Sequence, residues 1–338
     1  MQRSLNIALI GAGRIGQVHA STIAYRVPGA RLAAVYDPIS AAAESVAEKF
    51  HLPKIAQNSD EIMTDPTIDA VLICTPTATH APLIIAAAAA GKHIFCEKPI
   101  ALDLATTDAA IAAARAAEVH LQVGFNRRWD SNYVRVREAI AAGELGNLRT
   151  LHVISRDSGP PPISYVKTSG GIFLDMTIHD WDMLRFLSGS EIKEVYVMGA
   201  VMVNPEIGDA GDIDSHMTVL RFTSGVIGMV ENCRQASYGY DQRVEAFGSA
   251  GAMLIENNTP NTAILSTESG IHHTLPHHFF MTRYTEAYAA EIEGFVDAVS
   301  NGTPVAVTGQ DGRHALAVGL AAKLSYAERR PVMVTEVG

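Results

Sequence analysis

Cysteine is scarce in this chain, and its scarcity excludes two kinds of structural support. The 338 residues include only Cys74, Cys96 and Cys233. Their number is odd and no two are spaced as Cys-x-x-Cys, so the sequence indicates neither a disulfide framework nor a cysteine-based zinc site. We interpret all three as small, apolar core residues.

Long apolar runs and an excess of positive charge are also missing. The alanine-rich run at 84–91 ends at a glycine and is too short to cross a membrane. The first residues lack the apolar stretch and cleavage pattern of a signal peptide. The formal net charge of -10 argues against binding to nucleic acid or to an anionic membrane. We therefore expect a cytoplasmic protein that binds a small molecule.

The first third of the chain alternates short apolar runs with helical patterns. The runs are almost wholly apolar, as in strands that are buried on both faces, and the segments between them favour helices. This alternation predicts an α/β fold with a doubly wound parallel sheet, a Rossmann domain, over residues 1–124. The predicted strands lie within 6–13, 31–37, 69–76, 93–99 and 120–126, and the helices within 41–50, 80–92 and 104–118.

After about residue 125 the pattern changes. Several β-like runs follow one another, and segment 221–228 has the composition of a hairpin turn, which favours a mainly antiparallel sheet. The chain closes on two helical patterns. We assign residues 125–338 to a second α/β domain, whose closing helices can pack back on the first. The β-like runs are 148–157, 192–203, 215–222, 226–233 and 242–249, and the helical patterns are 131–146, 286–302 and 309–330.

A glycine-rich turn follows the first predicted strand and opens a helix. The string GAGRIG, residues 11–16, matches G-x-G-x-x-G, whose glycines permit a tight turn and a close approach of backbone to a pyrophosphate. Asp37 ends the next strand, where a carboxylate binds the adenosine ribose and repels a 2′-phosphate. The combination predicts NAD, rather than NADP, as the cofactor. The predicted contacts in this part are Gly11, Gly13, Arg14, Ile15, Gly16 and Asp37.

Two further strand ends fall at the same edge of the predicted sheet, where open α/β sheets bind ligands. The string CTPTATH, 74–80, places Thr75, Pro76 and His80 there as cofactor contacts, although His80 is equally explained as a polar residue near a helix start. The string FCEKPI, 95–100, places Glu97 and Lys98 where the nicotinamide end would lie. Lys98 can hydrogen-bond a reacting oxygen, or the two residues can form a solvated charge pair.

Residues 170–187 predict a helix with an unusual polar stripe. On a wheel of about 100° per residue, Asp175, His179 and Asp182 share one face with Phe186 inside an apolar border. No Lys or Glu, the residues of an ordinary solvent-facing stripe, occurs between positions 171 and 190. Three interpretations stay open: a proton-handling face, an N-cap aspartate with a core histidine, or a metal site, for which no second helix offers matching ligands.

Two other clusters of ionisable residues are interpreted as solvated loops. The string GDAGDID, 208–214, lacks the twelfth-position glutamate of a calcium loop. The string HHTLPHH, 272–278, has no partner cysteines. The sequence therefore predicts no metal site.

These motifs, in this order and spacing, resemble the Gfo/Idh/MocA oxidoreductase family across essentially the whole chain. They are GAGRIGQVHA at 11–20, the strand-end aspartate, CTPTATH, FCEKPI, and GGIFLDMTIHDWDM at 170–183. Within the family, the strings at 123–133, 155–173 and 238–252 resemble the inositol 2-dehydrogenases most closely. Trp129 stands where related sequences often have Phe or Tyr, and Asn126 where some have an apolar residue, which leaves the substrate open.

The resemblance implies an N-terminal Rossmann domain and a C-terminal substrate-binding domain. The open, mainly antiparallel sheet of the second domain supports oligomers in this family, commonly homotetramers. The family's EKP lysine falls on Lys98, and its D-x-x-x-H motif falls on Asp175 and His179, which are the implied catalytic residues. The implied substrate contacts are Lys98, Arg127, Asp175, His179 and Tyr240, with Arg128 as a competitor of Arg127.

The implied reaction is oxidation of a secondary hydroxyl of a cyclic polyol, myo-inositol or a related isomer, by hydride transfer to NAD. His179 would take the hydroxyl proton, Asp175 would orient the imidazole or bind a neighbouring hydroxyl, and Lys98 would stabilise the developing charge. The alternatives are a dehydrogenase of an aldose or other sugar, an NAD-dependent glycosidase, and a non-catalytic NAD-binding regulator.

Overall fold

The structure, a computed structural model, describes residues 4–338, which divide into two compact units. One unit comprises the chain up to residue 129 together with 286–316, and the other comprises 130–285 together with 317–338. The chain therefore returns to the first unit near its end. The helix over residues 285–301 and the beginning of the helix over 309–328 belong to the unit that contains the glycine turn.

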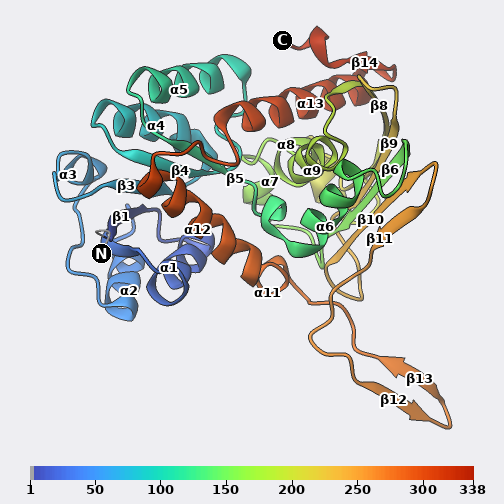
Figure 1. The fold of residues 1–338 in the computed structure, drawn as a ribbon, viewed down its shortest axis with the longest axis horizontal. Helices are drawn as coiled ribbons and strands as arrows, with labels where there is room; N and C mark the ends of the chain where they lie inside the picture. Colours follow the sequence, from blue (N-terminus) through green and yellow to red (C-terminus); the bar gives the residue numbers. More distant parts are fainter. Residues whose placement is uncertain (1–3) are drawn as a thin grey trace. The chain divides into compact units, whose positions relative to one another are not determined.

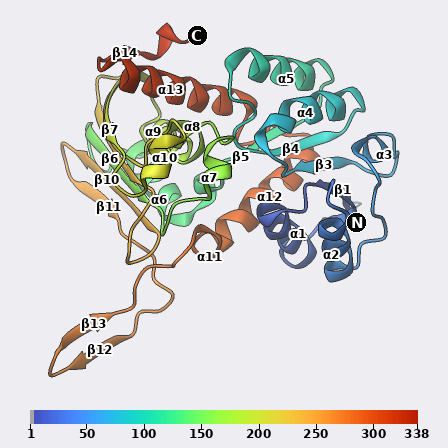
Figure 2. The ribbon, with the colours of Figure 1, turned by 180° about the vertical axis from the view of Figure 1, so that it is seen from behind.

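The first unit is built on a five-stranded parallel sheet in the order β2-β1-β3-β4-β5, the Rossmann arrangement that the sequence predicts. Apolar residues such as Ile7, Leu9 and Phe95 fill the sheet, and helices lie on both of its faces (Figures 1 and 2). The strand order reverses between β1 and β3, so the carboxyl ends of these strands form the crevice where such sheets bind ligands.

The elements of the first unit, in chain order, are β1 (Leu5–Ile10), α1 (Arg14–Arg26), β2 (Ala30–Tyr36), α2 (Ser40–Phe50), α3 (Ser59–Met63), β3 (Ala70–Ile73), η1 (Thr77–Thr79), α4 (His80–Ala89), β4 (His93–Glu97), α5 (Leu104–Ala116), β5 (Leu121–Gly124), η2 (Asn126–Trp129), α12 (Thr285–Asn301) and the beginning of α13 (Gly309–Glu328).

The second unit contains a seven-stranded sheet in the order β11-β10-β6-β9-β8-β7-β14. Neighbouring strands are antiparallel except β6 and β9, so the sheet is mainly antiparallel, as the sequence predicts. Residues alternate between its faces: along β8, His216 and Thr218 are buried, whereas Met217 and Val219 are exposed. Helices α8 and α9 lie on one face, and no element of the second unit itself covers the other (Figures 1 and 2).

The elements of the second unit, besides the end of α13, are α6 (Ser131–Ala141), β6 (Leu148–Arg156), α7 (Ile163–Val166), α8 (Ile172–Asp175), α9 (Ile178–Ser188), β7 (Ile192–Ala200), α10 (Pro205–Asp209), β8 (Ser215–Phe222), β9 (Ile227–Cys233), β10 (Asp241–Gly248), β11 (Ala252–Ile255), β12 (Ile264–Thr267), β13 (Gly270–His273), α11 (Phe280–Arg283), β14 (Val332–Met333) and η3 (Val334–Glu336).

A separate hairpin of β12 and β13 projects from the second unit (Figures 1 and 2). Its two four-residue strands pair with each other and are exposed along their whole length. His272 and His273 are exposed, as the interpretation of 272–278 as a solvated loop predicts. They lie in strand β13, however, and not in a loop. The strands escape prediction because neither has a buried face whose alternation would reveal it.

Candidate active site

The glycine turn after β1 has the shape that a dinucleotide requires. Gly11 has φ +100°, and a Cβ there would stand 2.6 Å from the carbonyl carbon of Cys74, while a Cβ at Gly16 would stand 2.0 Å from the carbonyl oxygen of Gly11. At Gly13, by contrast, a Cβ would meet nothing within 4 Å. The turn therefore combines tight backbone packing with open space directly before α1, which fits a pyrophosphate at a helix N-terminus.

Asp37 lies beside this turn. Its Oδ2 accepts the backbone N–H of Ala12 at 2.7 Å, and its Oδ1 accepts the N–H of Ile39 at 2.8 Å. The carboxylate keeps further lone pairs that can accept hydrogen bonds from ribose hydroxyls. Arg14 and Ile15 form the first turn of α1. The structure thus brings the predicted strand-end acid to the glycine turn, and its ribose contact stays a prediction.

His80 connects the ends of β3 and β4. It is buried, with Nδ1 2.7 Å from the carbonyl oxygen of Pro99 and Nε2 2.7 Å from that of Thr75. Burial lowers the pKa of His80 in spite of these two carbonyl contacts. The structure gives His80 a bracing role within the unit, so that Thr75 and Pro76 are held at the strand end. Cofactor contacts of these three residues stay predictions.

Glu97 ends β4, and Lys98 follows it with a cis bond to Pro99. The Oε1 atom of Glu97 lies 2.7 Å from Nε2 of His19, a fully buried residue of α1 that sequence reasoning did not identify. A carboxylate tied to a buried histidine does not fit the interpretation of Glu97 and Lys98 as a solvated charge pair. Lys98 itself is partly buried.

Arg127 and Arg128 lie together on η2. Arg128 donates from Nη2 to Asp311 at 2.9 Å. Burial alone would raise the pKa of Asp311, but Arg128 and hydrogen bonds from Thr308 lower it to about 2. Arg128 is thus engaged with an ionised acid of its own unit, and Arg127 as the substrate contact, with Arg128 as its competitor, stays a prediction.

The prediction of one helix over 170–187 is wrong, because residues 176–177 separate α8 from α9. Thr177 explains the break. Its N–H reaches back five residues to the carbonyl of Ile172 at 2.9 Å, and its Oγ1 contacts Nε2 of His216 at 2.9 Å and Oδ1 of Asn232 at 2.6 Å. A helical wheel therefore does not apply across the break.

Asp175, at the end of α8, is held by two side chains from elsewhere in the second unit. Tyr165 donates its hydroxyl proton to Oδ1 at 2.9 Å, and Nη1 and Nη2 of Arg234 lie 3.3 and 3.4 Å from Oδ2. Arg234 is 1% exposed and also lies 3.8 Å from Asp212, which accepts the N–H of Ile172. Asp175 is thus a fixed partner of a buried cation, which excludes its interpretation as a helix N-cap.

His179 lies in the first turn of α9 and is partly exposed, so it is not an enclosed core histidine. Two aspartates of the same helix, Asp180 and Asp182, are fully buried. Ser155 donates to Oδ1 of Asp180 at 2.7 Å, and Asn232 donates to Oδ2 at 2.9 Å. Asp180, which sequence reasoning missed, therefore fixes α9 to the sheet below His179.

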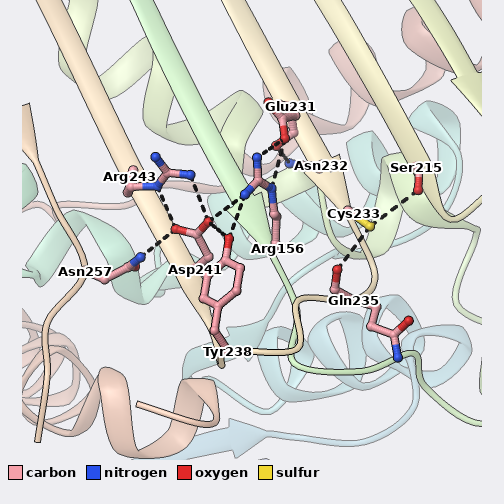
Figure 3. A network of polar contacts seen from close by, with 10 residues as sticks. All are labelled: Arg156, Ser215, Glu231, Asn232, Cys233, Gln235, Tyr238, Asp241, Arg243 and Asn257. Carbon is pink, nitrogen blue, oxygen red and sulfur yellow. Dashed lines mark hydrogen bonds and ion pairs between the residues drawn. The ribbon is translucent and has the colours of Figure 1, made fainter. Parts of the chain in front are cut away.

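Tyr240 precedes β10 directly, and its buried ring meets Tyr284 edge-on, with 6.0 Å between the ring centroids. Its neighbour Asp241 is the centre of an ionic network across β6, β9 and β10 (Figure 3). Asp241 accepts hydrogen bonds from Arg156, Tyr238, Arg243 and Asn257, and Arg156 also pairs with Glu231. Sequence reasoning missed this network, which fixes the backbone next to Tyr240.

The interpretation of 208–214 as a solvated loop is wrong at both ends, because residues 208–209 belong to α10 and Asp214 is buried. Asp214 is fully buried and accepts three backbone N–H groups from residues 202–204 at 2.7 to 3.0 Å. Burial alone would raise the pKa of Asp214, but these hydrogen bonds lower it. Across residues 4–338, no group of three or more His, Cys, Asp or Glu side chains is arranged to hold a metal ion. Nor does that range contain a helix long and apolar enough to cross a membrane.

Comparison with known families accounts for both units. The family described as "Oxidoreductase family, NAD-binding Rossmann fold" matches residues 5–125, and the GFO/IDH/MocA C-terminal domain matches residues 133–254. The chain belongs to the Gfo/Idh/MocA oxidoreductase family. The prediction of an NAD-binding Rossmann domain, made from the glycine turn and the strand-end acid, is thereby confirmed.

Full-length members of the Gfo/Idh/MocA family are closely similar to this chain. It is 44% identical to the myo-inositol 2-dehydrogenase of Thermotoga maritima over 98% of this chain and 99% of the relative. It is 46% identical to an inositol 2-dehydrogenase of Rhizobium meliloti, again over 98% and 99% of the two chains. The scyllo-inositol dehydrogenase of Lactobacillus casei, solved with NAD(H) and scyllo-inositol, superposes with a TM-score of 0.92 at 28% identity, over 98% of this chain and 100% of that one.

Proposed function

We propose that the chain oxidises a secondary hydroxyl of a cyclic polyol, myo-inositol or a related isomer, to the ketone. Bound NAD supplies the hydride acceptor. The observation that carries this proposal is the fixed carboxylate of Asp175, held by Tyr165 and Arg234 one turn before the partly exposed His179. Such a pair of residues is suited to moving a hydroxyl proton, and two relatives that match essentially the whole chain are inositol 2-dehydrogenases.

Three side chains divide the work of the reaction. His179 takes the proton of the substrate hydroxyl while the adjacent C–H bond gives up its hydride and the C–O bond becomes a carbonyl. Asp175, held by Tyr165 and Arg234, orients the imidazole or binds a neighbouring hydroxyl. Lys98 donates a hydrogen bond to the reacting oxygen and stabilises the negative charge that develops on it.

The remaining site residues bind rather than react. Thr75, Pro76, His80 and Glu97 border the nicotinamide end of the crevice, and Asp37 binds the adenosine ribose and disfavours the 2′-phosphate of NADP. Arg127 and Tyr240 contact the hydroxyls of the polyol. The glycine turn with Arg14 and Ile15 receives the pyrophosphate at the N-terminus of α1.

The assembly is a cytoplasmic homotetramer. The uncovered face of the second sheet supports this part of the proposal because it exposes large apolar side chains on four of its strands, β7, β8, β9 and β10. A surface of this kind marks a protein–protein interface. The side chains concerned are Met198, Met217, Val219, Ile227 and Phe247. Light scattering during size-exclusion chromatography measures the molar mass of the assembly. The mass of a monomer would contradict the proposed tetramer.

A substrate panel tests the reaction. Purified protein is given NAD or NADP with myo-inositol, scyllo-inositol, glucose, xylose and galactose, and NADH or NADPH is followed by absorbance. The proposal requires faster reduction with an inositol than with any aldose, and with NAD than with NADP. Preference for an aldose would assign the chain to sugar oxidation instead.

A further inference from the structure

Four polar side chains, three of them fully buried and one partly exposed, lie together in the first unit near the cofactor end of β4. We call them the acid cluster: His19 of α1, Glu97 of β4, Gln122 of β5 and Glu291 of α12. His19, Gln122 and Glu291 are fully buried. His19 contacts Glu97 at 2.7 Å, Gln122 donates to the backbone carbonyl of Glu291 at 2.9 Å, and the ring of His19 meets that of Tyr288, one turn before Glu291, edge-on.

Glu291 stands out within the acid cluster. Neither of its carboxyl oxygens has a hydrogen-bond partner or a paired cation among residues 4–338. An ionised carboxylate in such surroundings is strongly unfavourable because nothing replaces its hydration. Burial, and secondly the negative charge of Glu97, raise the pKa of Glu291 well above its ordinary range. Burial without a partner and the direction of this pKa shift both favour the neutral form of Glu291.

The other unsatisfied atoms of the acid cluster offer no hydrogen-bond donor to Glu291. Nδ1 of His19 and Oε1 of Gln122 also lack partners among the described residues. His19 carries its proton on Nε2, directed at Glu97, so its Nδ1 is an acceptor. The amide oxygen Oε1 of Gln122 is an acceptor as well. Neither atom therefore offers a donor to an ionised Glu291, which leaves the neutral acid favoured. The cluster then holds one negative charge, on Glu97, which lies next to Lys98 at the edge of the sheet that faces the cofactor.

We propose that Glu291 carries a proton in the free protein and releases it when oxidised NAD binds, so that the acid cluster compensates the positive charge of the nicotinamide ring. The proposal rests on the placement of the nicotinamide end beside Glu97 given above. A nearby cation favours the ionised form of a carboxylic acid, whereas the uncharged ring of NADH does not. The proton goes to solvent, and Glu291 acts as a positioning residue that touches neither substrate nor cofactor.

The proposed proton release predicts the direction in which the affinity for NAD changes with pH, and this change can be measured. Because binding of NAD frees a proton, the affinity for NAD increases with pH, by at most about tenfold per pH unit for one linked proton. The affinity for NADH lacks this dependence. A glutamine at position 291 keeps the shape and hydrogen-bonding capacity of the neutral acid but has no proton to release, so it separates the proposed role from a purely structural one.

Titration calorimetry in buffers of different ionisation heat tests the proposal on the complete protein without substrate. Wild type is expected to release protons with NAD but not with NADH, and Glu291→Gln is expected to release none while binding NAD at low pH as wild type does. Glu286→Gln, which alters an exposed acid of the same helix, is the matched control and should behave as wild type. Equal proton release by wild type and Glu291→Gln would overturn the proposal.

A second readout needs no variant. The infrared difference spectrum between NAD-bound and free wild-type protein should show loss of a protonated carboxyl band and gain of a carboxylate band, and NADH should produce neither change. Absence of that change with NAD would refute the release. Neither measurement depends on turnover, so failure of this proposal can be told apart from failure of polyol oxidation, which the substrate panel reports.

Discussion

At the scale of single residues, the site depends on side chains whose partners come from distant strands. Arg234 follows β9 and holds Asp175 of α8, and Asp180 of α9 is held by Ser155 and Asn232 of the sheet. The sequence predicted Asp175 and His179 because they form a motif at fixed spacing. It could not predict Arg234, because an isolated arginine in a strand region carries no signal of the acid that it will meet.

Arg234 is expected to be required for both stability and rate. Replacing it with Gln leaves Asp175 and Asp212 without their buried cation, which should lower the free energy of unfolding by about 3 kcal/mol. It should also reduce kcat, because Asp175 is no longer held in place. Urea unfolding and steady-state kinetics measure the two effects. Arg221→Gln, which removes an exposed pair with Glu194, is the control and should cost under about 0.5 kcal/mol. Unchanged kcat in Arg234→Gln would show that Arg234 does not position Asp175.

At the scale of elements, the sequence predicted what repeats locally and missed what tertiary contacts impose. The buried strands β1 to β5 are continuous apolar runs, so their ranges were recognisable. The break between α8 and α9 was not recognisable, since it depends on the contacts of the Thr177 hydroxyl group with His216 and Asn232. The same limit applies to the hairpin of β12 and β13, which has no buried face.

The glycine turn allows a matched pair of substitutions. Gly13 has φ -68° and open space around a Cβ, so Gly13→Ala should fold with a stability within about 0.5 kcal/mol of wild type. Its methyl group should nevertheless weaken NAD binding by roughly tenfold or more, because it occupies the path of the pyrophosphate. Gly16→Ala should instead destabilise the protein by about 1–3 kcal/mol, since its Cβ would overlap the carbonyl oxygen of Gly11.

Thermal unfolding and fluorescence titration with NAD distinguish these effects. A Gly13→Ala protein that bound NAD as tightly as wild type would contradict the placement of the pyrophosphate before α1. A Gly16→Ala protein of wild-type stability would contradict the close packing of this turn.

At the scale of the whole molecule, buried histidines make stability depend on pH. Burial, assisted by the charge of Arg234, lowers the pKa of His216 from 6.5 to about 3. The unfolded chain therefore binds a proton at this residue between pH 6.5 and 3 that the folded protein does not, and stability falls as pH falls through this window. His216 alone should cost about 2 kcal/mol between pH 7 and pH 5.

Urea unfolding at several pH values checks this slope. His216→Gln should show a shallower loss of stability on acidification than wild type, whereas His272→Gln, at an exposed position of β13, should leave it unchanged. A slope that is the same in His216→Gln and wild type would assign the acid sensitivity to other groups.

The central claim is that this member of the Gfo/Idh/MocA family oxidises a cyclic polyol with His179 as the proton acceptor. The most direct test is NADH formation by wild type and His179→Ala across the inositol and aldose panel, with NAD binding measured in parallel. Wild type should reduce NAD fastest with an inositol, and His179→Ala should lose about 10² to 10⁴ in kcat while binding NAD normally. Near-wild-type turnover by His179→Ala, or oxidation of aldoses but of no inositol, would contradict the account.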